Sequence, residues 1–480
     1  MRTGQQYLAS LRDARRIYLG GERVREVAEH PAFRGITHTI AALYDAALDP
    51  ANDMAYTAPE TAAPANKAFM IPRSADDLRQ RRAAIGRWAR MTNGLVGRGP
   101  DHVGSFLAGF ASAPYVFERQ DSRRAPFGEN VTRFYRRLLE EDLYVTYVII
   151  PPQVDRSQTA QAQEEAFLQA GVYAERDDGI VVRGAQMLGT AAAISNVLFV
   201  SCIPPLQPGD EDYALSFVVP LATPGLKLYP RRPYALGQPS VFDYPLSTQF
   251  DETDSLVVFD DVFVPWEHVF VYRDVALTRG QFFDTAAHVL GNTQAQIRLV
   301  AKMQFLAGIA RKIAATNRID GMPPVQELLG ELAALAAIVE GMVLGAEASC
   351  LVDEHGVARP NPRFLYSAMG LQAQLYPRAL HVLRQLAGGG VIQVPDSYRE
   401  LISAETAPDV TRYVRSAGVP SEERIKLFKL AWDLVGSEFA GRHLQYEMFY
   451  AGAPHIAKGY AFRNYRYEEA VACVDDFLQT

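Results

Sequence analysis

The spacing of the apolar residues changes twice along the chain, and this constrains the fold most. Residues 1–140 read mainly as helix, and Ser74, followed by Asp76 and Asp77, predicts the capped start of one helix. Over residues 141–275, short β-branched runs alternate with Pro, Gly and Asp clusters, which is typical of an antiparallel barrel or sandwich. Beyond this, apolar residues recur every three or four positions. We therefore predict an α+β chain with an N-terminal helical domain, a middle β domain and a C-terminal four-helix bundle with a tail over 276–480.

The C-terminal part carries clear signals for helix ends. Pro323 and Pro324 separate two helical segments and can begin the second, where a missing N–H costs nothing. Gly388-Gly-Gly390 interrupts a third long helical segment. Ser421, followed by two glutamates, predicts the cap of a final helix. Long helices of this kind pack as an antiparallel bundle.

Length and charge narrow the class of protein. A chain of 480 residues can hold two or three cores, because single cores stop growing at roughly 250–300 residues. The 48 basic and 55 acidic residues give a net charge of −7, which argues against nucleic-acid binding as the main task. We find no uninterrupted apolar run near the roughly 20 residues of a membrane helix, and no signal peptide. We expect a soluble, cytoplasmic protein without a membrane or nucleic-acid partner.

Several common cofactor sites have no sequence support. Cys202, Cys350 and Cys473 are too widely separated to suggest a disulfide framework or a thiolate metal site. The histidines show no metal-ligand spacing, so no metal is expected. No Gly-x-Gly-x-x-Gly follows a strand, and no phosphate-binding P-loop occurs.

One strand ends in a polar segment that can hold a ligand. The apolar run Val145–Ile150 stops at Pro151 and Pro152, which supply no N–H for a sheet ladder. An amide, a carboxylate, a guanidinium and a hydroxyl follow within five residues, in the segment Gln153–Ser157. Such a group suits a planar ligand with polar edges, because loops on a rigid scaffold carry function. A solvated turn closing a hairpin is the alternative.

This segment and several others occur in the order found in one enzyme family. They are Met1–Gly4, Tyr7–Arg12, His30–Gly35, Arg98–His102, Pro152–Ser157, Val182–Thr190, Phe250–Asp254, Val257–Glu267 and Leu427–Trp432. Together they resemble the large components of two-component flavin monooxygenases, the 4-hydroxyphenylacetate 3-monooxygenase family. The resemblance extends over nearly the whole chain.

The resemblance implies a fold and a chemistry. The fold is acyl-CoA dehydrogenase-like and assembles as a homotetramer through the helical bundle. The implied cofactor is FAD, delivered as FADH2 by a separate NAD(P)H:flavin reductase, and the co-substrate is O2. A flavin C4a-hydroperoxide would hydroxylate an aromatic, phenolic small molecule in a dry pocket.

The resemblance also implies site residues. Arg98, His102 and Tyr147 match catalytic positions that also touch the flavin. The remaining implied flavin contacts are Val148, Ile149, Gln153, Val154, Asp155, Arg156, Thr190, Phe449, Tyr450, Ala451 and Gly452.

The chain departs from the family pattern at two of these positions. The family usually carries Tyr at position 102 and His at position 147, whereas this chain has His102 and Tyr147. An imidazole and a phenol donate and accept differently at neutral pH. We therefore expect an unusual acceptor, such as an elaborated phenol, an indole or an aromatic amine, and poor turnover of plain 4-hydroxyphenylacetate. N-oxygenation of an amine is the alternative outcome.

Two other function classes are alternatives to a monooxygenase. A flavin dehydrogenase of the acyl-CoA type would need a carboxylate base near the flavin, for which Glu340 and Glu347 are the candidates. A non-enzymatic helical assembly protein would leave the Gln153–Ser157 segment unexplained. The acidic group Asp251, Glu252 and Asp254 is interpreted as a solvated strand end.

Overall fold

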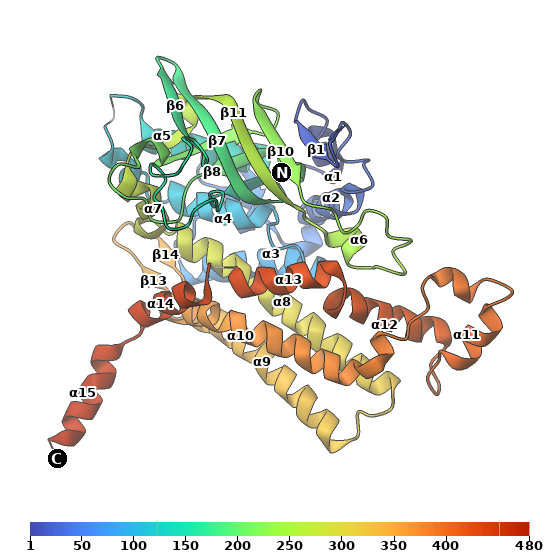
Figure 1. The fold of residues 1–480 in the computed structure, drawn as a ribbon. Coiled ribbons are helices and arrows are strands. Elements are labelled where there is room, and N and C mark those ends of the chain that lie inside the picture. Colours follow the sequence, from blue (N-terminus) through green and yellow to red (C-terminus); the bar gives the residue numbers. More distant parts are fainter. Residues whose placement is uncertain (122, 451, 480) are drawn as a thin grey trace.

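The computed structural model describes residues 1–121, 123–450 and 452–479 of the chain. Mostly helical N-terminal elements are followed by two β-sheets and then by long C-terminal helices (Figure 1). This order confirms the predicted α+β class and the acyl-CoA dehydrogenase-like fold.

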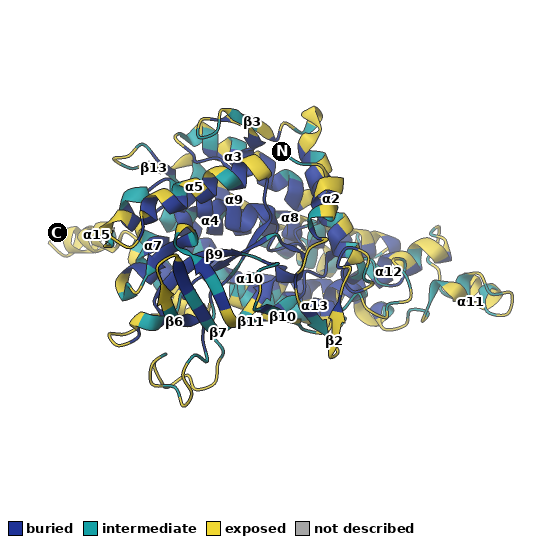
Figure 2. Cartoon of the chain, turned by 90° about the horizontal axis from the view of Figure 1, so that it is seen from above, coloured by how far each residue is buried: buried dark blue, intermediate teal, exposed yellow. Residues whose placement is uncertain are grey.

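The N-terminal part surrounds one fully buried helix, α4. Ser74 accepts a hydrogen bond from Asp77 N and caps α3, as predicted. In α4 every residue from Pro100 to Phe110 is buried, and Figure 2 shows this helix deep in the molecule. The elements are α1 (Gly4–Ser10), β1 (Ile17–Leu19), β2 (Glu22–Val24), α2 (Arg34–Leu48), β3 (Ala55–Ala58), β4 (Ala63–Asn66), α3 (Ala75–Met91), α4 (Pro100–Ala111) and α5 (Phe127–Glu141).

The middle part contains a six-stranded sheet, β2-β1-β10-β11-β7-β6, and a four-stranded sheet, β12-β9-β8-β5. The additional elements are β5 (Val145–Val148), β6 (Gly171–Arg176), β7 (Gly179–Thr190), β8 (Val197–Val200), β9 (Leu215–Pro220), β10 (Leu226–Pro230), α6 (Ser247–Phe250), β11 (Asp254–Pro265) and β12 (Val269–Tyr272). In the long β7–β11 ladder, Thr190 pairs with Asp254.

The predicted antiparallel barrel or sandwich needs correction. Two strand pairs are parallel, β5 with β8 and β1 with β10, and β1 and β2 come from the part predicted to be helical. The sheets that the described residues form do not close into a barrel. β-branched runs and turn residues mark strands, but strand partners depend on packing between distant segments, which local pattern does not encode.

The C-terminal helices form a bundle against this body (Figure 1). They are α7 (Val275–Asp284), α8 (Ala287–Thr316), α9 (Pro323–Ala348), α10 (Pro362–Ala387), α11 (Ala407–Tyr413), α12 (Ser421–Val435), α13 (Glu438–Phe449), α14 (Pro454–Asn464) and α15 (Tyr467–Leu478), with a short hairpin of β13 (Leu351–Val352) and β14 (Ala358–Arg359). The predicted start of α9 and the end of α10 before Gly388 are confirmed.

The prediction for Ser421 was wrong. Pro420 is the N-cap, Ser421 is the first helical residue, and three further helices follow. The Ser421 hydroxyl instead donates to the carbonyl of Val410, 3.1 Å away on α11. A tertiary hydrogen bond has replaced the local cap.

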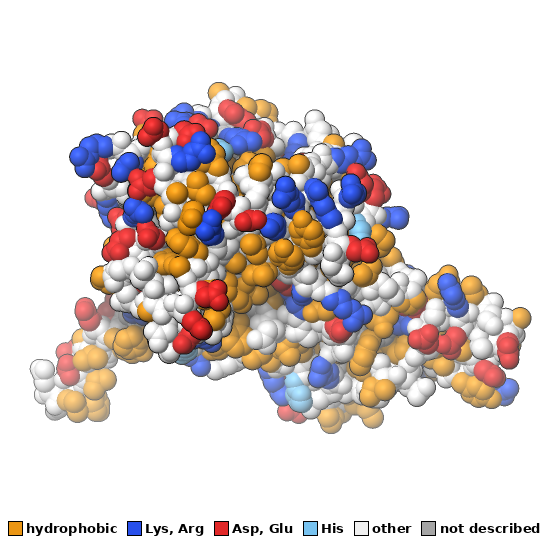
Figure 3. Space-filling view, turned by 45° about the horizontal axis from the view of Figure 1, so that its top comes forward, with side chains coloured by type: hydrophobic (Ala, Val, Ile, Leu, Met, Phe, Trp, Pro, Cys, Tyr) orange, Lys and Arg blue, Asp and Glu red, His pale blue; other side chains and the backbone are white. Residues whose placement is uncertain are grey.

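Helix α9 is long and apolar enough to cross a membrane by length and composition, yet only 17% of its most apolar window is buried. A search for uninterrupted apolar runs does not find this helix, because glutamates interrupt its apolar residues. Ile338 and Leu344 are 41% and 42% exposed on it. On the face drawn in Figure 3, acidic and basic side chains are mixed, with apolar side chains between them.

Candidate active site

Arg98 lies just before α4, and its charge has an aromatic rather than a carboxylate environment. Its guanidinium lies 5.0 Å from the ring centre of Tyr147, 5.2 Å from that of Tyr446 and 4.7 Å from that of Tyr450. The residue is 9% exposed, and no carboxylate of the described residues pairs with its guanidinium. A buried cation needs a compensating anion or strong acceptors. The arrangement is suited to a ligand that brings negative charge.

His102 is held as a neutral imidazole behind Arg98. Its Nε2 lies 2.7 Å from Arg98 Nη1, and its Nδ1 lies 2.8 Å from Gln294 Oε1. Because a guanidinium can only donate, Nε2 accepts, and Nδ1 carries the proton that is donated to Gln294. Burial, and then the charge of Arg98, lowers the pKa of His102 well below its usual value. His102 therefore orients Arg98 and holds no proton on the nitrogen facing it.

Tyr147 lies on the other side of Arg98. Arg98, His102, Tyr147, Tyr446 and Tyr450 together form the Arg98 group. The ring centre of Tyr147 lies 5.4 Å from that of His102 and 5.8 Å from that of Phe106. Burial raises the pKa of Tyr147, against the opposing effect of Arg98. Its hydroxyl makes no hydrogen bond to the described part of the chain. This hydroxyl is a polar group free to contact a ligand.

Thr190 is fixed by a partly buried carboxylate, that of Asp254. Its hydroxyl donates to Asp254 Oδ1 at 2.6 Å, and Asp254 is ion-paired with Arg442 at 2.8 Å and with Arg231 at 2.9 Å. Burial alone would raise the pKa of Asp254, but Arg442, Arg231 and the Thr190 hydroxyl outweigh it, so the pKa is lowered.

Glu252 anchors the backbone at Arg98. Its carboxylate accepts from Gly97 N at 2.9 Å and from Arg98 N at 2.6 Å, and Arg442 lies 3.5 Å from it. Arg442 thereby links the anchors of Arg98 and Thr190. The interpretation of this acidic group as a solvated strand end was wrong, because Asp251 and Glu252 are only 2% and 1% exposed. The arginines that neutralise them are distant in sequence.

Tyr446 is a further member of the site that sequence reasoning missed. Its hydroxyl is buried without a hydrogen-bond partner in the described structure. A Cβ added at Gly97 would lie 2.4 Å from that hydroxyl oxygen, so this close approach requires glycine. The sequence could have identified Tyr446, because it precedes the predicted contact Tyr450 by four residues, the spacing of one helical turn.

The predicted strand-end contacts divide into two sets. Val148 and Ile149 are buried, and their carbonyls already accept from Ser201 N and Ile203 N at 3.1 and 3.2 Å. The residues of the loop beyond are exposed: Gln153, Val154, Asp155 and Arg156. Within this loop, the Asp155 carboxylate accepts from the backbone and hydroxyl of Ser157.

At the end of α13, the Tyr450 ring joins the Arg98 group, whereas Phe449 is 45% exposed. Gly452 is exposed and has a positive φ of 87°. Ala451 lies outside the described residues.

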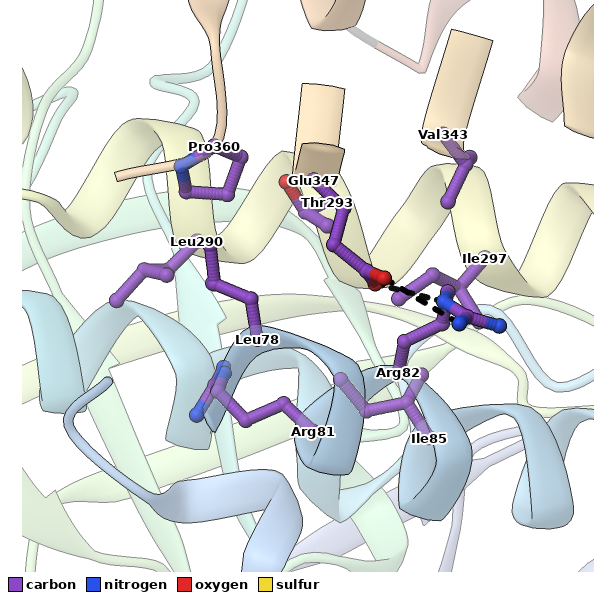
Figure 4. Close-up of a pocket in the computed structure, with 10 residues that line it drawn as sticks. All are labelled: Leu78, Arg81, Arg82, Ile85, Leu290, Thr293, Ile297, Val343, Glu347 and Pro360. Atoms are coloured by element: carbon purple, nitrogen blue, oxygen red, sulfur yellow. Dashed lines mark hydrogen bonds and ion pairs between the residues drawn. The ribbon is translucent and has the colours of Figure 1, made fainter. Parts of the chain in front are cut away.

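The glutamates considered for a dehydrogenase base lie elsewhere. Glu347 pairs with Arg82 at 2.6 Å and lines a cavity of about 10 Å³ between α3, α8 and α9 (Figure 4). Glu340 is exposed on α9. Neither the Arg98 group nor Thr190 lines that cavity. Among the described residues, no cluster of three or more His, Cys, Asp or Glu side chains could hold a metal ion.

Comparison with known families decides the relationship. Residues 3–271 match the 4-hydroxyphenylacetate 3-hydroxylase N-terminal family, and residues 278–479 match the corresponding C-terminal family. The chain belongs to the 4-hydroxyphenylacetate 3-hydroxylase family. It is a monooxygenase.

Three relatives illustrate this family. The 4-hydroxyphenylacetate 3-monooxygenase oxygenase component of Pseudomonas aeruginosa is 36% identical over 96% of this chain and 88% of its own length. A Streptomyces globisporus monooxygenase named for a 3-chloro-4-hydroxyphenyl group on a peptidyl-carrier protein is 36% identical over 94% of this chain and 85% of its own. A crystal structure of the HpaB oxygenase component with FAD and 4-hydroxyphenylacetate has a TM-score of 0.93 and 32% identity, covering 100% of this chain and 98% of that one.

Proposed function

We propose that this member of the 4-hydroxyphenylacetate 3-hydroxylase family uses FADH2 and O2 to hydroxylate a phenolic ring, with the Arg98 group as its active site. Relatives named as oxygenase components imply a separate reductase that supplies the reduced flavin. The observation that carries the proposal is the buried Arg98 cation, enclosed by three tyrosine rings and a neutral histidine.

The residues present fit a bound flavin. The Arg98 charge lacks a carboxylate partner among the described residues, and the buried Tyr446 hydroxyl has no acceptor. Thr190 and the backbone at Gly97 and Arg98 are held rigidly by Asp254 and Glu252. Reduced FAD would supply the activation of O2, and the aromatic walls would exclude water from it.

The chain's own residues would act on the phenol. Arg98 would stabilise a phenolate oxygen by charge-assisted hydrogen bonds, which makes the ring more nucleophilic. The free hydroxyl of Tyr147 would orient that oxygen, because His102 has committed both ring nitrogens to Arg98 and Gln294. In this proposal Arg98 and Tyr147 are catalytic, and His102 is a positioning residue.

The His102 and Tyr147 exchange supports a substrate other than plain 4-hydroxyphenylacetate. Relatives act on phenols of different size, as their names state. The test is product mass spectrometry over a panel of phenols, indoles and aromatic amines with a surrogate reductase. We expect little product from 4-hydroxyphenylacetate, and more from the double variant His102→Tyr/Tyr147→His. Efficient ortho-hydroxylation of 4-hydroxyphenylacetate by the unmodified chain would contradict this.

We also propose a homotetramer that covers the apolar face of α9. Only 17% of the apolar window of α9 is buried within one chain, and exposed apolar faces of this kind mark interfaces. Ile338→Glu with Leu344→Glu should lower the mass in solution, since both side chains are about 40% exposed on α9. Exposed Ile402→Glu, outside α9, is the control. An unchanged mass for the α9 variant would exclude α9 from the interface.

A further inference from the structure

The loop that carries Arg98 is held at two points. Residues 92–99 connect α3 to α4, and Glu252 binds backbone N–H groups at the C-terminal end of this loop. At its other end, the Gly94 carbonyl accepts a hydrogen bond from Arg298 Nη1 of α8 at 2.8 Å. Gly94 has a φ of 68°, and a Cβ added there would lie 2.5 Å from the carbonyl oxygen of Arg298. This position therefore requires glycine, because the loop lies directly against α8.

The guanidinium that binds the loop is also half of a buried ion pair. Arg298 Nη1 and Nη2 donate to the two carboxylate oxygens of Glu447 on α13, at 2.6 and 2.8 Å, and both residues are 1% exposed. The same carboxylate accepts from Lys302 Nζ at 2.8 Å and from Gln372 Nε2 of α10 at 2.6 Å. Burial alone would raise the pKa of Glu447, but Arg298 and Lys302 outweigh it and lower the pKa to about 2. One ionised carboxylate thus joins three helices of the bundle.

Helix α13 connects this pair to the Arg98 group. Figure 1 shows α13 between the helical bundle and the sheets. Its Tyr446 directly precedes Glu447, and three guanidinium groups surround the Tyr446 ring: Arg442 at 4.8 Å, Arg98 at 5.2 Å and Arg298 at 5.5 Å from the ring centre. Arg442 and Arg298 are both ion-paired. A displacement of Arg298 would therefore shift both the loop and the ring that enclose the charge of Arg98.

We propose that Arg298 is a positioning residue for the Arg98 group. Its guanidinium binds the loop at Gly94 and the carboxylate of Glu447 at once, which sets the position of Arg98 against the Tyr446 ring. A planar guanidinium can do this because its donors point in fixed directions, whereas the single ammonium of a lysine cannot serve all three acceptors. This role rests on the proposed function only in that the Arg98 group is taken as the active site.

Hydrogen exchange of the full-length protein, without flavin or phenol, tests the hold on the loop. Arg298→Lys keeps the buried charge beside Glu447 and frees the Gly94 carbonyl. We expect the amides of residues 97 and 98 to exchange about tenfold faster in this variant, because a loop held at one end opens locally more often.

Two further variants separate positioning from stability. Lys302→Met is the matched control, because Lys302 lies one turn further along α8 and bonds Glu447 and His443 rather than the loop. It should leave both amides unchanged. Arg298→Met/Lys302→Met/Glu447→Gln removes all three charges together, a change that buried ion pairs often tolerate without loss of stability. This triple variant should fold and still show the faster exchange.

Kinetics show whether the loop matters for the reaction. With reduced FAD, O2 and a phenol, we expect Arg298→Lys to lower kcat about tenfold, while KM for the phenol changes by less than about threefold, because a misplaced Arg98 loses contacts made in the transition state. Lys302→Met should retain both kcat and KM.

Unchanged exchange at residues 97 and 98 in Arg298→Lys and in the triple variant would overturn the proposal. Faster exchange with an unmodified kcat would make the Arg298–Glu447 pair purely structural and overturn the positioning role. Equal effects of Lys302→Met would indicate a general loss of packing and overturn it too. The exchange needs no flavin chemistry, so it still decides the hold on the loop if an active Arg98→Gln variant refutes the proposed function.

Discussion

Among single residues, the buried Arg98 cation carries the proposed chemistry. Arg98 is buried among the rings of Tyr147, Tyr446 and Tyr450 and receives orientation from neutral His102. A hydrogen bond to a charged group contributes about 1.5–3 kcal/mol. The charge, rather than the size of the side chain, should therefore control activity.

We predict that Arg98→Gln lowers kcat/KM for the phenol by about ten- to hundredfold, which corresponds to losing one charge-assisted hydrogen bond. Arg98→Lys should lose less, because the charge remains. Stopped-flow mixing of each variant with reduced FAD, O2 and a range of phenol concentrations measures the change in kcat/KM. Arg183→Gln is the matched control, since Arg183 also lies over a tyrosine ring but on the surface. Equal rates for Arg98→Gln and the unmodified chain would remove Arg98 from the mechanism.

Sequence motifs found the residues of the Arg98 group that are close together in the chain. Arg98 and His102 are four residues apart across the start of α4, so one short sequence motif contains both. Gln294, which fixes the tautomer of His102, comes from α8, 192 residues away. Arg442 likewise reaches Asp254 from 188 residues away. Neither contact can be predicted from neighbouring residues in the sequence, because both depend on how the helical bundle packs against the sheets.

At the element scale, the ends of β7 and β11 position the site. Thr190 and Asp254 are cross-strand partners, and Asp254 joins the two strands to α13 through Arg442. The strands themselves were predictable from their β-branched runs. Their pairing was not predictable from the local sequence. The role of the exposed loop after β5 in flavin binding stays a prediction. The division at residues 140 and 275 stays a prediction.

We predict that Asp254→Asn destabilises the protein by about 2–3 kcal/mol, because it leaves Arg442 and Arg231 partly unpaired in a site that is mostly shielded from solvent. Flavin affinity should fall as well, since Thr190 loses its anionic acceptor. Urea unfolding and titration with reduced FAD provide the two readings.

Asp261→Asn is the control on the same strand. Asp261 pairs with Arg183 at 2.7 Å, and both side chains are exposed. Its effect on unfolding should stay below about 1 kcal/mol. Similar losses for both variants would mean that burial of the Asp254 pair does not matter.

At the scale of the whole molecule, buried neutral histidines should make stability depend on pH. Burial, with a smaller effect of Arg279, lowers the pKa of His288 to about 3, and burial also lowers the pKa values of His102 and His443. The unfolded chain binds a proton at each of these residues below about pH 6.5, while the folded chain does not. The contribution of these histidines to the free energy of unfolding is therefore complete above about pH 6.5 and falls as the pH is lowered.

The free energy of unfolding falls between pH 7.5 and pH 5.5. We predict that this fall is about 1 kcal/mol smaller in His288→Gln than in the unmodified chain. The difference between urea midpoints at the two pH values, at constant protein concentration, measures this. His355→Gln, at an exposed histidine, should leave the difference unchanged. A pH dependence that is the same with and without His288 would show that this residue does not contribute.

In the proposed reaction, the chain inserts one atom of O2 into a phenol, using reduced flavin made by a separate reductase. The most direct measurement is a reaction under ¹⁸O₂ with photoreduced FAD, a phenol from the substrate panel and no reductase, followed by mass spectrometry of the product. We expect one ¹⁸O atom in the product, and none when the label is in the water. Unlabelled product, or substrate oxidation without O2 when a dye accepts the electrons, would contradict it.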